Sequence, residues 1–300
     1  MLLRQQIRHT RLHQTAGSGR RWMSVRPEER APETRKKVTI QHLLNMKRKH
    51  TPITMLTAYD FPTGRACEAH GVDMTLVGDS LAQVCLGYDA TTRLTLDEMV
   101  HHCRAVARGS KAPFLVGDMP FGTYQAGVDD AVRNAVRLVR EGGVDAVKIE
   151  GGVEYVDLVK RLTTVGIPVM GHIGLTPQRQ AIQSGYRVQG KSAAGALSLV
   201  DSALALEAAG GVCDRARGYP TRRRGAHYET PAPCGYDWHR RRLGDGRAGP
   251  RVGRLNGNLV WAHGQAVRDR SFPSASESYE MPAEEAERFV GLAGARGDEP

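Results

Sequence analysis

Three carboxylates, those of Asp79, Asp118 and Glu150, stand at or just beyond the carboxyl ends of three different short apolar segments. If these segments are parallel strands, the three acids meet at one face and repel one another unless a cation neutralises them. Mg2+ does so with oxygen ligands and keeps positions for water or substrate. Lys148 lies two residues before Glu150, so it faces the same side of its strand and can hold a carboxylate or stabilise an enolate. His172, at the end of the next segment, can donate a hydrogen bond to a developing oxyanion.

Each of these residues alone also has an ordinary structural explanation. An Asp after a strand commonly forms a turn or caps a helix, a lone Lys usually lies at the surface, and His172 fits a hydrogen-bonded structural histidine. The combination, rather than any single member, indicates metal-assisted enolate chemistry. From the spacing of these residues alone, a phosphate-binding barrel is an alternative, but the sequence shows no glycine-rich phosphate loop.

The segments that must position these side chains alternate between strand and helix from Val38 onward. Short β-branched or apolar runs predict strands at 53–58, 74–79, 113–118, 146–150 and 168–173. Longer stretches predict helices at 61–70, 95–109, 127–142, 153–164 and 192–209. Thr95 and Glu98 form a capping box at one helix start, and Gly142–Gly143 ends another helix.

Strands that alternate with helices at this spacing predict an α/β fold with a parallel sheet, because parallel neighbours need a crossover connection. A doubly wound sheet and a (β/α)8 barrel both fit the pattern. The barrel is favoured, because polar residues end four different strands and that face carries the chemistry in barrels. A doubly wound sheet would concentrate its site at one switch point.

The net charge of +10 is concentrated in the first 26 residues and in a stretch from about Cys213 to Arg254. Residues 1–26 contain six Arg and no acid, which predicts a mitochondrial transit peptide; a basic tail without a targeting role is the alternative. The five cysteines are widely spaced and form no CxxC pair, which fits a reducing compartment. No apolar run is long enough for a membrane span.

Long ordered stretches of the sequence resemble the ketopantoate hydroxymethyltransferase family. They are MLTAYDFPTGRACEAHGVDMTLVGDSLAQVCLGYDATTRLTLDEM, GDMPFGTY, AVKIEGG, and MGHIGLTPQ followed by GYRVQG. The resemblance runs from about Val38 to Gly211 and implies a (β/α)8 TIM barrel of the phosphoenolpyruvate-dependent type, usually a large homo-oligomer. It also implies transfer of a hydroxymethyl group from 5,10-methylenetetrahydrofolate to 3-methyl-2-oxobutanoate, which gives 2-dehydropantoate (ketopantoate) for pantothenate and coenzyme A biosynthesis.

The resemblance assigns roles to individual residues through the shared motifs. Asp79 and Asp118 correspond to Mg2+ ligands that also contact substrate, and Glu150 corresponds to a third acid of the metal shell, directly or through water. Ser80 and Lys148 correspond to substrate contacts. Lys148 and His172 are the expected catalytic side chains of this chain.

The family's catalytic base, a Glu on the sixth strand in a motif of the type VLExxP, is missing. The segment after Gly211 is Arg-rich, contains no Lys up to residue 254 and lacks apolar periodicity, so we expect strands six and seven to be lost and the barrel to be incomplete. A reading frame shifted by one nucleotide lets residues 214–220 encode IVLEAIP, which places the Glu near Arg217. Residues 235–242 and 247–251 can likewise encode a residue followed by MIGIGAG, and GQVLV. We interpret the segment at about 213–260 as out-of-frame translation.

The sequence therefore predicts four segments. A transit peptide and linker occupy 1–36, a barrel domain with strands one to five occupies 37–212, an aberrant basic and disordered segment occupies 213–262, and a family-like tail occupies 263–300. The alternatives are a catalytically inactive chain, because the base is missing, or a basic protein that binds nucleic acid through the Arg-rich segment. Small molecules are the expected partners, and neither a membrane nor nucleic acid is expected.

Overall fold

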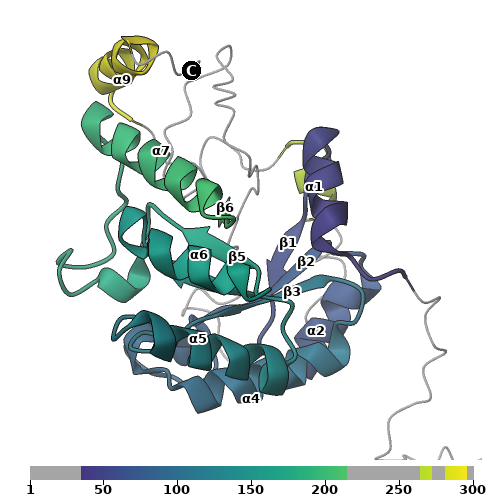
Figure 1. Ribbon diagram of the computed structural model, residues 1–300. Helices are drawn as coiled ribbons and strands as arrows, with labels where there is room; N and C mark the ends of the chain where they lie inside the picture. The colour runs from purple at the N-terminus through teal and green to yellow at the C-terminus, as the bar shows by residue number, and fades with distance from the viewer. Residues whose placement is uncertain (1–34, 215–263, 272–280, 296–300) are drawn as a thin grey trace, which may run out of the picture. The chain divides into compact units, whose positions relative to one another are not determined.

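The computed structural model describes residues 35–214, 264–271 and 281–295 (Figure 1). Six strands form one sheet, in the order β1-β2-β3-β4-β5-β6, and every neighbouring pair is parallel. The strands are β1 (Met55–Thr57), β2 (Met74–Val77), β3 (Phe114–Asp118), β4 (Ala146–Glu150), β5 (Val169–His172) and β6 (Val212–Asp214). Each strand lies beside its predecessor, with no point at which the order reverses. This sequential order is that of a barrel and excludes the doubly wound alternative for the described strands.

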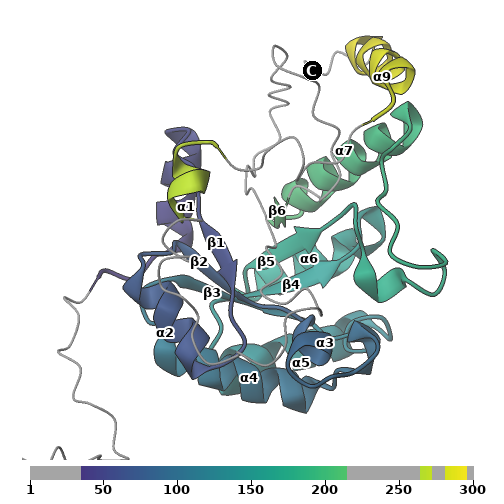
Figure 2. The ribbon, with the colours of Figure 1, turned by 180° about the vertical axis from the view of Figure 1, so that it is seen from behind.

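Helices connect the strands and cover one side of the curved sheet (Figures 1 and 2). The α-helices are α1 (Ile40–Arg48), α2 (Phe61–Ala69), α3 (Leu81–Val84), α4 (Leu96–Gly109), α5 (Val128–Arg137), α6 (Val156–Thr164), α7 (Ala193–Ala208) and α9 (Ala283–Ala295). Shorter helical turns are η1 (Thr91–Arg93), η2 (Leu138–Gly142), η3 (Val153–Tyr155) and η4 (Pro177–Arg179).

The predicted helix ends are confirmed. Thr95 and Glu98 form the reciprocal capping box at the start of α4. Helix α5 continues into the wider turn η2, which Gly143 ends with a φ of 74°. Only a residue without a Cβ adopts this conformation without cost, so the glycine allows the chain to turn directly into β4.

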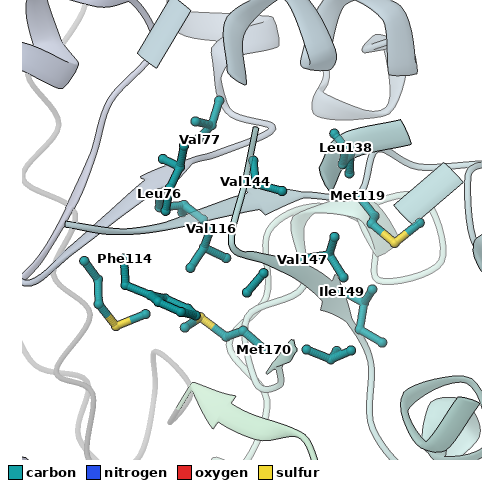
Figure 3. Close-up of a cluster of buried hydrophobic side chains, with 14 of the residues drawn as sticks. Leu76, Val77, Phe114, Val116, Met119, Leu138, Val144, Val147, Ile149 and Met170 are labelled. Atoms are coloured by element: carbon teal, nitrogen blue, oxygen red, sulfur yellow. The ribbon is translucent and has the colours of Figure 1, made fainter. Parts of the chain in front are cut away.

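Buried apolar side chains on both faces of the sheet form the core (Figure 3). All five residues of β3 and all five of β4 are buried, as expected for strands of a parallel sheet covered on both faces. Figure 3 shows side chains of β2, β3 and β4, such as Leu76, Val116 and Val147, in one cluster with Leu138 of η2 and Met170 of β5. The core therefore fixes the strands whose ends carry the predicted site.

The five predicted strands are all present, each within two residues of its expected limits. Helix α1 was not predicted. Its sequence IQHLLNMKR is polar on most positions, and only Leu43 and Met46 are buried, so its apolar signal is weak.

The expected loss of strand six is corrected by the structure. Val212–Asp214 pairs with β5 in parallel, with Val212 beside Met170. Gly210, at a φ of 87°, turns the chain at the end of α7, and the pairing uses backbone groups that every residue here supplies. The described residues contain no seventh strand, and β6 does not pair with β1, so the sheet that they form is an open, incomplete barrel.

The two described parts of the tail pack against the barrel body. Phe289 and Ala293 of α9 lie in a small apolar cluster with residues of α7, and Oε2 of Glu285 accepts a hydrogen bond of 2.7 Å from the backbone N–H of Ala193. Nη2 of Arg268 lies 3.2 Å from Oδ2 of Asp73, which is almost fully buried before β2. No helix of the described residues is both long and apolar enough to traverse a lipid bilayer.

Several predictions fall outside the described residues. These are the transit peptide up to residue 34, the basic segment from residue 215, and the position near Arg217 expected for the Glu base. Cys67, Cys85 and Cys103 are free thiols.

Candidate active site

The parallel register of the sheet places four predicted site residues side by side. Asp118 is the direct partner of Lys148, and Nζ of Lys148 lies 2.6 Å from Oδ1 of Asp118. Glu150 is the partner of His172, whose Nδ1 lies 3.5 Å from Oε1 of Glu150. The same ring nitrogen lies 3.5 Å from Nζ of Lys148. It can accept a hydrogen bond from the ammonium or donate one to Glu150, according to its tautomer.

Asp79 and Ser80 join this cluster from the turn that follows β2. The backbone N–H of Asp79 donates a hydrogen bond of 2.9 Å to Oδ2 of Asp118. Oγ of Ser80 shares a hydrogen bond of 2.9 Å with the hydroxyl of Tyr59. Asp79, Ser80, Asp118, Lys148 and Glu150 are each 3–5% exposed, so their charges and hydrogen bonds act in a largely dry environment.

Two further polar residues, which the sequence analysis did not single out, lie in the same cluster. Nε2 of Gln178 donates hydrogen bonds of 3.0 Å to Oδ2 of Asp79 and 3.0 Å to the carbonyl of Met119, and its backbone N–H donates to Oε2 of Glu150 at 2.9 Å. The hydroxyl of Tyr124 donates to Oε1 of Gln178 at 2.6 Å. Tyr124 is the last residue of the family-like string GDMPFGTY, and Gln178 is the last residue of MGHIGLTPQ. Their presence in these strings is the only feature of the sequence that could have identified them as site residues.

Burial and mutual repulsion shift the pKa values of this cluster. Burial raises the pKa of Asp118 to about 7, against the opposing effect of the Lys148 ammonium. Burial, followed by the charge of Glu150, raises the pKa of Asp79. Burial lowers the pKa of Lys148, but the surrounding carboxylates outweigh it and the net shift is upward. Lys148 is therefore a cation at neutral pH, and its ammonium faces three acidic side chains, of which Asp118 is partly protonated at that pH.

The donor set suits a hard divalent cation. Oδ1 of Asp118 is buried and, although it lies 2.6 Å from Nζ of Lys148, it accepts no hydrogen bond of regular geometry within the described residues. Carboxylate oxygens of Asp79 and Asp118 are the ligands that Mg2+ prefers, and the excess negative charge favours its entry. Among the described residues, no three His, Cys, Asp or Glu side chains form a ready-made metal cluster. The structure thus links the backbone N–H of Asp79 to the carboxylate of Asp118, and it connects the carboxylates of Glu150 and Asp79 through Gln178.

Residues 37–213 match the family model described as ketopantoate hydroxymethyltransferase. The chain belongs to the ketopantoate hydroxymethyltransferase family. The match covers every strand of the described sheet except the last residue of β6, and it includes all the site residues above.

Two relatives illustrate how much of the family's length this chain spans. A 3-methyl-2-oxobutanoate hydroxymethyltransferase of Emericella nidulans is 54% identical over 176 residues, which cover 59% of this chain and 50% of the relative. One of Oleidesulfovibrio alaskensis is 46% identical over 258 residues, which cover 79% of this chain and 89% of the relative. The chain therefore spans about half of its fungal relative and most of the bacterial one.

Solved structures of two other enzymes are similar at lower levels. An oxaloacetate acetylhydrolase aligns with a TM-score of 0.45 and 15% identity over 60% of this chain and 64% of that chain. A 2,3-dimethylmalate lyase, a member of the PEP mutase/isocitrate lyase superfamily, aligns with a TM-score of 0.44 and 15% identity over 86% of this chain and 93% of that chain.

Proposed function

We propose that this protein transfers a hydroxymethyl group from 5,10-methylenetetrahydrofolate to 3-methyl-2-oxobutanoate, which gives 2-dehydropantoate for pantothenate and coenzyme A biosynthesis. The observation that carries the proposal is the buried cluster of Asp79, Asp118 and Lys148 at the carboxyl ends of three neighbouring strands, in a chain of this family. The names of the relatives support the reaction. No feature of the described residues favours nucleic-acid binding.

The first task of this site is to bind a 2-oxo acid. Asp79 and Asp118 would hold Mg2+, with Glu150 in the outer part of the site. When bound, Mg2+ supplies a Lewis acid that draws electron density from the substrate carbonyl and makes the hydrogen on C3 more acidic. Oγ of Ser80, already oriented by the hydroxyl of Tyr59, can donate a hydrogen bond to the substrate.

The second task is to stabilise negative charge on the substrate as the C3 proton leaves. Because its pKa is raised, Lys148 remains protonated and acts as a fixed positive charge rather than as a base. His172 is 13% exposed and contacts both Lys148 and Glu150, so it can donate a hydrogen bond to the oxygen where charge develops.

The proton acceptor is the part of the site that the written sequence lacks. The restored reading frame would place a Glu near Arg217, three residues after the end of β6 in the sequence. Asp214, the last residue of β6, is the register partner of His172 at the end of β5. We therefore propose that the shifted frame supplies the base.

An activity assay tests the proposal. Purified chain, as written and with the frame restored between about residues 213 and 260, is supplied with 3-methyl-2-oxobutanoate and 5,10-methylenetetrahydrofolate, with and without a chelator. We expect the frame-restored protein to form 2-dehydropantoate and to lose activity with chelator, and we expect the written chain to remain at background. Formation of product by the written chain would refute the assignment of the base, and inactivity of both folded proteins would refute the proposed reaction.

We also propose a mitochondrial location and a homo-oligomeric state. The Arg-rich, acid-free residues 1–26 support the location, which import of a fusion of residues 1–36 to a reporter would test. Light scattering of the frame-restored protein would test the assembly, and a monomeric mass would contradict it.

A further inference from the structure

Gln178 is the residue through which the acids of the site are connected, and the chemistry above does not use it. It reaches the cluster from η4, after β5, and is 5% exposed. Its hydrogen bonds extend to groups at the ends of three other strands: Asp79 after β2, Met119 after β3 and Glu150 at the end of β4. Gln178 thus donates a hydrogen bond to each of two acids of the site, Asp79 and Glu150.

The orientation of the Gln178 amide is determined by its neighbours. Its two N–H groups face two acceptors, Oδ2 of Asp79 and the carbonyl of Met119, while its Oε1 faces the hydroxyl of Tyr124. Rotation of the amide by half a turn would set Oε1 against both of those oxygens, which cannot donate. The hydroxyl of Tyr124 is itself fixed, because it accepts a hydrogen bond of 3.2 Å from the backbone N–H of Glu150.

We propose that Gln178 is a positioning residue for the divalent-cation site. Its amide holds the carboxylate of Asp79 in place, and its backbone N–H holds that of Glu150, so two acids that repel each other keep their positions before the cation arrives. This inference rests on the proposed cation site at Asp79 and Asp118. A ligand that is fixed in advance loses less freedom on binding, and removal of such a supporting hydrogen bond typically weakens metal affinity by about 10- to 100-fold.

Binding of Mn2+, followed by electron paramagnetic resonance, measures this effect without a need for catalysis. The variant Gln178→Met keeps the length of the side chain and the backbone N–H to Glu150 but removes the amide. Tyr124→Phe removes only the hydroxyl that orients the amide. The control is Gln183→Met in the same loop, because Nε2 of Gln183 donates to the hydroxyl of Thr176 at 2.8 Å rather than to a carboxylate. All are made in the full chain as written and in the frame-restored protein.

We expect the dissociation constant for Mn2+ to rise about 10- to 100-fold in Gln178→Met, to rise by a smaller factor in Tyr124→Phe, and to stay unchanged in Gln183→Met. Thermal denaturation without metal shows which variants fold. If Gln178→Met does not fold, unchanged Mn2+ affinity in Tyr124→Phe overturns the proposal. If Gln178→Met folds with a lower melting temperature but binds Mn2+ as tightly as the parent, the residue has only a structural role. If the folded parent itself binds no Mn2+, the proposed cation site fails first, and the role of Gln178 fails with it.

Discussion

Replacement of Lys148 by Met tests the electrostatic account of the site. Nζ of Lys148 lies 2.6 Å from Oδ1 of Asp118, and both side chains are 4% exposed. The substitution keeps most of the apolar stem but leaves Asp118 buried opposite Asp79 without its cation. Removal of one partner of a buried pair costs about 3–5 kcal/mol, because the remaining charge stays out of water. We therefore expect the free energy of unfolding of Lys148→Met to fall by about 4 kcal/mol at pH 8.

Lys37→Met is the matched control for this substitution. Nζ of Lys37 lies 2.6 Å from Oδ2 of Asp145, the same distance, but the two side chains are 41% and 30% exposed. Exposed pairs contribute about 1 kcal/mol or less, because water screens them. Urea denaturation at pH 8, followed by circular dichroism, compares both variants with the parent. An equal loss of stability in the two variants would refute the reasoning, because the two pairs have the same distance but Lys148 is buried among several charged groups and Lys37 is exposed.

The pH dependence provides a second check on the same variant. Burial already raises the pKa of Asp118 to about 7 with Lys148 present, and loss of the ammonium raises it further. The folded variant then binds a proton more tightly than the unfolded chain does, so its stability increases as the pH falls. The deficit relative to the parent should shrink between pH 8 and pH 6. A deficit that widens over this range would contradict the account.

Three further predictions concern the site and its supports. Affinity for Mn2+ should rise from pH 6 to pH 8, because protons compete with the ion for Asp118, whose pKa is about 7. Calorimetry in buffers of different ionisation enthalpy should detect the protons released on binding, and an affinity independent of pH would contradict a role of Asp118 as a ligand. Asp73→Ala should lower the free energy of unfolding by about 3 kcal/mol, because the buried carboxylate forms ion pairs with Arg35 and Arg268 and accepts a hydrogen bond from the backbone N–H of Thr54. A loss below about 1 kcal/mol in urea denaturation would disprove this role. Gly171→Ala should lower the free energy of unfolding by about 1–3 kcal/mol in the same assay, because the added Cβ would lie 2.7 Å from Cδ1 of Leu206. A variant as stable as the parent would show that Leu206 or α7 shifts to make room for the methyl group.

The strands and most of the site could be predicted because local sequence determines them. The runs that became β3 and β4 are mostly apolar, with their charged residues toward the carboxyl ends, and all ten residues are buried, which is typical of parallel strands buried on both faces. Once the strands are parallel and sequential, Asp118 and Glu150 must lie at the same edge. The period of two then places Lys148 and Glu150 on one face, without any knowledge of distant contacts.

The remaining features depend on contacts that local sequence does not encode. Gln178 lies in a segment with no regular periodicity, and its importance arises only because that segment returns across the ends of three strands. Asp73 reads as an ordinary polar residue before a strand, whereas its partners Arg35 and Arg268 come from opposite ends of the chain. Strand β6 was not predicted because its three residues are too few to show an apolar pattern. Its hydrogen bonds to β5, rather than its own sequence, make this segment a strand.

Titration of the 300-residue chain with Mn2+, in the presence and absence of 3-methyl-2-oxobutanoate, tests whether Asp79 and Asp118 hold a divalent cation that binds the 2-oxo acid. We expect one tightly bound ion per chain, tighter binding when the 2-oxo acid is present, and loss of that ion in both Asp79→Asn and Asp118→Asn. Binding of Mn2+ that persists unchanged in folded forms of both variants would contradict this expectation.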